Sequence, residues 1–187
     1  MGNVVIDMSM SLDGYIAAPN DNVDQGLGED GMRLHNWMFD DPSVFEQIYG
    51  DLTHNTGAVI IGRRTYDNSI KDWEGKGPLG DVPCFVVTHR PVEGADEVFR
   101  FVTDGIESAL EQARSVAGDK VIGLMGANLD QQFLAAGLVD EIRIHVIDVL
   151  LGDGKRLFDR LPGRVELERT GLSETGGVTN LEYRVRR

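Results

Sequence analysis

Short apolar segments that favour β-strands alternate along this chain with segments of helical periodicity. The strand-like segments are rich in β-branched and aromatic side chains, and they are residues 3–10, 58–61, 83–88, 98–102 and 120–124. A helix between two strands can be the crossover that lets both strands run parallel in one sheet. The alternation therefore predicts an α/β fold with helices on both faces of a central sheet.

Helix-start signals stand in the segments between these strands. Asp41 and Pro42 form an N-cap followed by proline at the first helical position. The apolar residues that follow repeat at helical spacing; they are Val44, Phe45, Ile48, Tyr49 and Leu52. Asp104 and Glu107 have the spacing of a capping box for a helix that ends at residue 117. Turns that contain glycine predict further helices over residues 63–70 and 128–137.

The C-terminal part of the chain has a different pattern. Residues 139–151 predict one long strand, and residues 165–173 and 178–185 predict two more. Gly176 and Gly177 separate the last two strands, which is typical of a hairpin. The sequence therefore predicts one three-layer α/β domain over the whole chain, with a mixed, mainly parallel sheet and a C-terminal antiparallel hairpin.

The charge of the chain limits its partners. Of its 187 residues 31 are acidic and 18 are basic, which gives a formal net charge of −13. Nucleic acids and anionic membranes bind basic surfaces, so neither is expected as a partner. The first fifty positions hold nine acidic residues and one basic residue. A ligand beside the N-terminal part of the chain is therefore expected to be neutral or cationic rather than phosphorylated.

Three further observations concern location. No apolar run approaches the ~20 residues of a membrane span. The N-terminal decapeptide has no basic residue and contains Asp7 where a signal peptide is apolar. Cys84 is the single cysteine, so no internal disulfide can form. Together they predict a cytoplasmic protein.

Two turns between a strand and a helix have the composition of anion sites. Gly62-Arg63-Arg64-Thr65 follows one apolar strand, and Met125-Gly126-Ala127-Asn128 follows another. The first N–H groups of a helix lack intrahelical partners and bind anions, and small residues let a phosphate approach the backbone. The alternative for each segment is an ordinary tight turn, with solvated arginines in the first case.

Thr88-His89-Arg90 lies at the end of a third strand. A hydroxyl, an imidazole and a guanidinium together can hold a phosphate monoester, such as the 2′-phosphate that distinguishes NADP from NAD. The alternative is a solvent-exposed turn before Pro91. The four histidines share no spacing typical of metal ligands, and neither a Rossmann glycine motif nor a serine nucleophile motif is present. Anion turns without a metal or a nucleophile suit hydride transfer from a bound nicotinamide.

The order of motifs resembles the dihydrofolate reductase-like superfamily, and more closely the C-terminal reductase domain of the bacterial riboflavin-biosynthesis deaminase-reductase. The resemblance covers essentially the whole chain. It rests on motifs that follow one another in order: Ser11-Leu12-Asp13-Gly14-Tyr15-Ile16-Ala17, Gly62-Arg63-Arg64-Thr65, Pro83 to Arg90, Met125-Gly126-Ala127-Asn128, Ala136-Gly137-Leu138-Val139-Asp140-Glu141, and Val149-Leu150-Leu151-Gly152-Asp153-Gly154 leading to Leu157-Phe158.

The resemblance implies an NADPH-binding cleft. The cofactor residues that it implies are Gly62, Arg63, Arg64 and Thr65 for the pyrophosphate and 2′-phosphate side; Thr88, His89 and Arg90 for the adenosine phosphate; Gly126, Ala127 and Asn128 for the diphosphate; and Ile16 and Ala17 beside the nicotinamide. It also implies an NADPH-dependent reductase of a pterin- or aminopyrimidine-type heterocycle.

Asp13 and Glu46 are the catalytic candidates. Asp13 follows the first strand, beside the expected nicotinamide, and Glu46 falls where dihydrofolate reductases have the helix acid that holds the pterin. A carboxylate there can bond an aminopyrimidine and relay a proton. The alternative for Glu46 is a solvated first-turn glutamate favoured by the helix dipole. Trp37 can stack on a ring or close the core.

Two residues depart from the family pattern. Met125 stands where the family usually has the first glycine of a pair, and Asp148 stands where proline is frequent. Met125 leaves open a binding protein that has lost catalysis, or a flavin or deazaflavin binder. Residues 142–151 resemble a strand near the sheet edge in the family, and such strands often pair across a two-fold axis, so we expect a homodimer.

Overall fold

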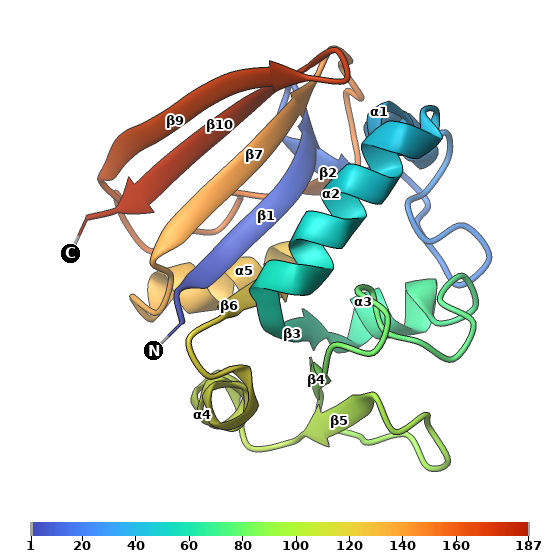
Figure 1. Ribbon diagram of the computed structural model, residues 1–187, viewed down its shortest axis with the longest axis vertical. Helices are drawn as coiled ribbons and strands as arrows, with labels where there is room; N and C mark the ends of the chain where they lie inside the picture. Colours follow the sequence, from blue (N-terminus) through green and yellow to red (C-terminus); the bar gives the residue numbers. More distant parts are fainter. Residues whose placement is uncertain (1, 187) are drawn as a thin grey trace.

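The computed structural model describes residues 2–186, and its centre is one eight-stranded sheet (Figure 1). The strand order is β5-β4-β3-β6-β1-β7-β10-β9. The strands are β1 (Val4–Ser11), β3 (Thr56–Gly62), β4 (Cys84–Val87), β5 (Phe99–Val102), β6 (Val121–Met125), β7 (Glu141–Ile147), β9 (Leu167–Thr175) and β10 (Val178–Val185). Six of them run parallel, and β10 is antiparallel to both of its neighbours. The predicted mixed sheet with a C-terminal hairpin is confirmed.

Helices cover both faces of the sheet, as predicted. They are α1 (Asn36–Phe39), α2 (Pro42–Asn55), α3 (Arg63–Ser69), α4 (Ile106–Ala117) and α5 (Ala127–Ala135), with a 3-10 turn η1 (Gly31–Leu34). A small second sheet joins β2 (Tyr15–Ala17) to β8 (Lys155–Arg156). No helix within residues 2–186 is long and apolar enough to cross a membrane.

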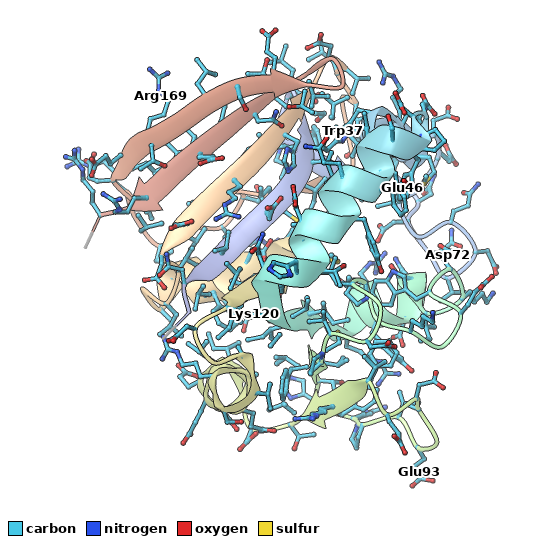
Figure 2. The ribbon with its side chains drawn as sticks, viewed as in Figure 1. Trp37, Glu46, Asp72, Glu93, Lys120 and Arg169 are labelled. Carbon is cyan, nitrogen blue, oxygen red and sulfur yellow. The ribbon has the colours of Figure 1, made fainter. Side chains whose placement is uncertain are left out.

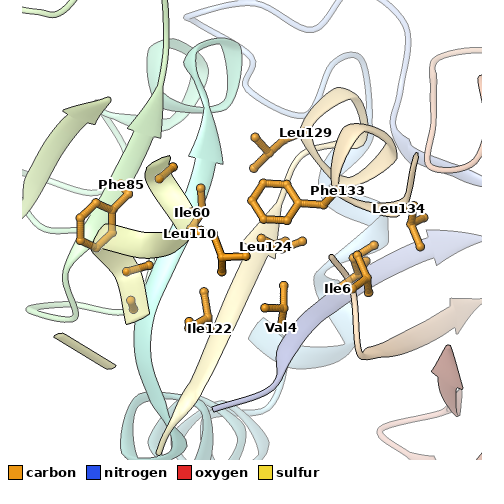
Figure 3. Close-up of a cluster of buried hydrophobic side chains, with 14 of the residues drawn as sticks. Val4, Ile6, Ile60, Phe85, Leu110, Ile122, Leu124, Leu129, Phe133 and Leu134 are labelled. Carbon is orange, nitrogen blue, oxygen red and sulfur yellow. The ribbon is translucent and has the colours of Figure 1, made fainter. Parts of the chain in front are cut away.

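Strand alternation divides the core into two layers. In β3, Ala58 and Ile60 point to one face and Val59 and Ile61 to the other. The first face packs against α4 and α5 in the largest apolar cluster, part of which is drawn in Figure 3. The second face belongs to a cluster with Tyr66 of α3, Trp73 of the following loop and the phenylalanines of β5. Both faces of the central strands are therefore buried, as parallel sheets require.

Helix α2 is held differently. Asp41 accepts a hydrogen bond from the Ser43 backbone N–H at 2.9 Å, so the predicted N-cap is confirmed. No residue of α2 is fully buried. Its apolar face, predicted from the spacing of Phe45, Ile48, Tyr49 and Leu52, lines an open cleft. The amphipathic pattern therefore gave the correct helix, but its apolar face borders a ligand-sized space.

Three local predictions were wrong. Gly105, with φ of 107°, is the N-cap of α4 and no side chain caps that helix, so Asp104 and Glu107 form no capping box. Helix α5 begins at Ala127, one residue before the predicted cap at Asn128. Strand β7 ends at Ile147, well before residue 151.

The position of β7 in the sheet also differs from the prediction. It lies between β1 and β10, so both of its edges are already paired and it cannot join a second copy edge to edge. The free edge on that side belongs to β9. The strand on which we based the homodimer is therefore not available for pairing with a second copy. The homodimer stays a prediction.

Candidate functional site

One large cleft opens where several parallel strands end. Its volume is about 1810 Å³, and it is lined by residues from the ends of β3, β4 and β6, from β2, from α2 and from one face of β1 and β7. Ligands of open α/β sheets bind outside the carboxyl ends of the strands. All twelve residues predicted to contact the cofactor line this cleft: Ile16, Ala17, Gly62, Arg63, Arg64, Thr65, Thr88, His89, Arg90, Gly126, Ala127 and Asn128.

The two helix starts at the cleft leave backbone donors available. Neither α3, after Gly62, nor α5, after Gly126, has a side chain that caps its first turn. Gly126 has a φ of +118°, and a Cβ atom there would lie 2.6 Å from Thr65 Oγ1. The second turn therefore needs glycine both for its backbone conformation and for its close approach to the first turn.

The arginines of the first turn are already paired. The Arg64 guanidinium donates to both carboxylate oxygens of Asp21, at 2.7 and 3.0 Å, and to the Asp21 carbonyl at 2.9 Å. The hydrogen bond from Arg64 holds the pKa of Asp21 below its usual value. Arg63 donates to Asp67 at 2.8 Å and to the Arg90 carbonyl at 2.6 Å. An anion at this turn must share these arginines with protein oxygens.

The Thr88–Arg90 segment leaves one guanidinium free to meet an anion. Thr88 is buried, and its hydroxyl accepts from the Arg90 backbone N–H at 3.2 Å, which fixes the turn. His89 and Arg90 are exposed. Within residues 2–186, no carboxylate lies within ion-pair distance of the Arg90 guanidinium. Of the three arginines predicted to bind the cofactor, Arg90 is therefore the one best placed to meet a phosphate in the cleft.

Asp13 lies outside the cleft and has a structural role. Its carboxylate accepts from the Ser11 hydroxyl at 2.6 Å and from the backbone N–H groups of Leu151 and Gly152 at 3.1 and 2.8 Å. These bonds, with that to Ser11 the strongest cause, lower the pKa of Asp13. Asp13 thus ties the end of β1 to the turn after β7, and its oxygens are not directed at the cleft.

Glu46 also lies outside the cleft. It is exposed, on the side of α2 turned away from β1 and β7 (Figure 2), while the neighbouring Phe45 faces the cleft. The position of Glu46 agrees with the alternative given above, a solvated glutamate in the first turn of the helix. Trp37, also labelled in Figure 2, does line the cleft, and its Nε1–H donates to Ser9 Oγ at 3.1 Å.

The sequence analysis missed a polar cluster on the floor of the cleft. His145 of β7 contacts Asp7 Oδ1 of β1 through Nε2 at 2.8 Å and Asn180 Oδ1 of β10 through Nδ1 at 2.6 Å. The Trp37 ring lies over His145, with 4.9 Å between ring centroids. Strand register brings these residues together, since Ser9 and Asn180 are the direct partners of His145 on either side.

Opposing effects act on the pKa of His145. Burial lowers it, but the hydrogen bonds to Asp7 and Asn180 outweigh burial, and the pKa is raised above its ordinary value of 6.5. Both ring nitrogens face carbonyl-type oxygens, an arrangement that suits the imidazolium because it donates from both. Nearby, burial lowers the pKa of His35 to about 4, and its Nδ1 has no hydrogen-bond partner among the described residues.

A period-two pattern was the available signal for this cluster. Polar Asp7, Ser9 and Ser11 alternate with apolar residues at the end of the first strand, and Arg143 and His145 alternate with isoleucines in β7. Such alternation indicates strands with one polar face. Which strands lie side by side, however, is not encoded in either segment alone.

Comparisons with known proteins agree with this architecture. A family model described as the RibD C-terminal domain matches residues 3–181. The Bacillus subtilis (strain 168) protein YwjB, itself uncharacterized, is 28% identical over 179 residues, which is 96% of this chain and 95% of YwjB.

Solved structures share the fold. A Shewanella sp. PV-4 protein assigned by its description to riboflavin biosynthesis superposes with a TM-score of 0.77 at 22% identity, over the full length of both chains. A Thermotoga maritima protein described as a diaminohydroxyphosphoribosylaminopyrimidine deaminase and 5-amino-6-(5-phosphoribosylamino)uracil reductase has a TM-score of 0.62 at 13% identity. That match covers 99% of this chain and 57% of the Thermotoga protein.

Proposed function

This chain belongs to the RibD C-terminal domain family, and we propose that it is an NADPH-dependent reductase of a pterin- or aminopyrimidine-type heterocycle. The observation that carries the proposal is the convergence of three strand ends, each predicted to meet an anion, on one cleft. When bound there, the nicotinamide supplies a hydride. The chain itself supplies the shape and charge that hold the dinucleotide and orient the ring.

The donor set fits a dinucleotide phosphate. Backbone N–H groups at the start of α5 can meet a diphosphate next to Gly126, because no side chain caps this helix start. Thr88 and Arg90 stand at a second position, suited to the 2′-phosphate of NADPH. Ile16 and Ala17 offer an apolar wall on the way to the cleft floor, beside which a nicotinamide can lie.

Parallel titrations with NADPH and NADH test the proposal. Trp37 and Trp73 both line the cleft, so protein fluorescence reports binding. We expect NADPH to bind at least tenfold more tightly than NADH, because only NADPH offers the extra phosphate to Arg90. We expect Arg90→Ala to remove that preference while NADH affinity stays the same. Absence of binding at ~1 mM of either nucleotide, near the upper end of ordinary KM values, contradicts the proposal.

Met125 supports a second candidate function, a binding protein for a flavin or deazaflavin that performs no hydride transfer from NADPH. Its side chain lines the cleft directly before Gly126, where it narrows the approach to the second turn. Met125→Gly discriminates between the candidates. A gain in NADPH affinity of tenfold or more favours the second candidate, and a visible absorbance band in the purified protein does so independently.

A further inference from the structure

The floor of the cleft holds a carboxylate with one oxygen that accepts no described hydrogen bond. Asp7 Oδ1 is taken by His145 at 2.8 Å, whereas Oδ2 is 4.0 Å from Arg143 Nη1, too far for a hydrogen bond. Arg143 itself donates to Glu141 at 3.0 Å. The Asp7 side chain is 24% exposed and lines the cleft. Oδ2 is therefore an acceptor that faces the ligand space.

The surroundings of Asp7 fix its orientation. His145 lies between Asp7 and Asn180 and is covered by Trp37, which Ser9 anchors. The charged or titratable groups near His145 are Asp7 from β1, Arg143 from β7 and His35 from the segment before α1. Asn180 from β10 completes the set as an uncharged acceptor. This arrangement holds the Asp7 carboxylate in one orientation at the edge of the cleft.

The same part of the cleft has aromatic walls. Phe39, Phe45 and Tyr49 form a continuous column on α1 and α2, with ring centroids 5.3 and 5.2 Å apart. All three line the cleft. A flat ring can lie against such a wall, and its edge can then reach the floor.

We propose that Asp7 is the specificity-determining acceptor for a ring N–H of the substrate, and that His145 is a positioning residue that orients the Asp7 carboxylate. The inference deepens the proposed function and rests on it for the identity of the reaction. It names the substrate class as a flat nitrogen heterocycle that presents N–H donors at its edge. It also assigns to a strand the carboxylate that the family resemblance placed on helix α2 at Glu46.

Calorimetric titration with isocytosine, a pyrimidine whose amino group and ring N–H donate from one edge, tests the assignment. We expect wild type to bind isocytosine, and Asp7→Asn to weaken binding tenfold or more, as expected for loss of a charge-assisted hydrogen bond. 2-Aminopyrimidine keeps the amino group but has no ring N–H, and it is expected to bind equally weakly to both proteins. Glu182→Gln, a carboxylate change on β10 outside the cleft lining, is the matched control and leaves isocytosine binding unchanged.

The role of His145 has a separate readout in the pH profile. In wild type, isocytosine affinity falls severalfold as pH rises through the raised pKa of His145, since the neutral ring loses one of its two donors. His145→Gln binds severalfold more weakly at pH 6 and shows no such profile. Circular dichroism reports whether Asp7→Asn folds. If it does not, the pH profile of His145→Gln still tests the proposal.

The outcomes separate this inference from the proposed function. If wild type does not bind isocytosine, or if Asp7→Asn binds it as tightly as wild type, the assignment of Asp7 is wrong. Wild type, Asp7→Asn and His145→Gln are expected to bind NADPH with the same Kd. Isocytosine binding that depends on Asp7, in a protein that does not bind NADPH, contradicts the proposed function and leaves the recognition site in place.

Discussion

The two ends of the cleft are built by different means. At one end, backbone groups of consecutive residues after β3 and β6 form the predicted phosphate turns, and glycine makes them possible at Gly126. At the other end, side chains of three different strands meet, and His145 joins Asp7, 138 residues away in the chain, to Asn180. The backbone-built end is sensitive to added atoms, whereas the side-chain-built end is sensitive to charge and pH.

The largest expected effect concerns pH at the side-chain-built end. His35 has a pKa of about 4 in the folded protein and 6.5 in the unfolded chain. The unfolded state therefore binds more protons between these values, and stability falls as pH falls through that window, by about 3 kcal/mol. We expect His35→Phe to remove most of this loss in urea unfolding at pH 7 and pH 4.5.

The matched control is His54→Gln, because His54 is exposed near the end of α2. It should leave the pH dependence of unfolding as in wild type. An equal loss of stability on acidification in wild type and His35→Phe means that the side-chain-built end is no more acid-sensitive than the rest of the protein.

The next effect concerns the backbone-built end. Gly126→Ala places a Cβ atom at φ +118° and 2.6 Å from Thr65 Oγ1. We expect it to lower the free energy of unfolding by about 2 kcal/mol and to weaken NADPH binding by about tenfold, with isocytosine binding retained. Gly163→Ala adds the same methyl group where no atom lies within 4 Å, and it should change neither property. Wild-type NADPH affinity in Gly126→Ala contradicts a backbone-built phosphate site.

A smaller effect on NADPH affinity is expected when the carboxylate that binds Arg64 is replaced. Asp21→Asn removes the charge that competes with a phosphate for this guanidinium. Exposed ion pairs contribute at most about 1 kcal/mol, so we expect NADPH affinity to rise about threefold. Asp24→Asn, which breaks the neighbouring pair with Lys71, is the control and leaves NADPH affinity unchanged. Weaker NADPH binding in Asp21→Asn would show that the 19–31 loop must stay anchored for the site to form.

The smallest expected effect is that of Glu46→Gln. It tells whether Glu46 or Asp7 binds the substrate ring. Glu46→Gln changes an exposed side chain without a described partner, so stability should change by less than about 0.5 kcal/mol. Isocytosine affinity should stay within twofold of wild type, in contrast to Asp7→Asn. A tenfold loss in Glu46→Gln reverses the assignment and returns the recognition role to helix α2.

The contrast between the two ends also explains what the sequence could predict. The element order, the hairpin at Gly176 and the positions of the two strand-to-helix turns depend on neighbouring residues, and their patterns were sufficient. The surroundings of Asp13 could not be predicted in the same way, because two of its partners, Leu151 and Gly152, lie 138 and 139 residues away in the chain.

The Asp7–His145 cluster was missed for a related reason. Alternation in each strand marks only a polar face, and only the pairing of β1 with β7 makes Asp7 and His145 neighbours. The end of β7 and its interior position depend on the same long-range pairing. Patterns of neighbouring residues predicted where the turns of the backbone-built end lie. The side chains of the other end come together only in the folded sheet.

A crystal structure with bound NADP⁺ tests the central claim, that one cleft has a backbone-built dinucleotide end and a side-chain-built ring end. The account predicts the 2′-phosphate at Thr88 and Arg90, the diphosphate beside Gly126, and the nicotinamide against Ile16 and Ala17 with Asp7 left free. A dinucleotide bound outside the cleft, or with its diphosphate on the floor beside Asp7 and His145, contradicts it.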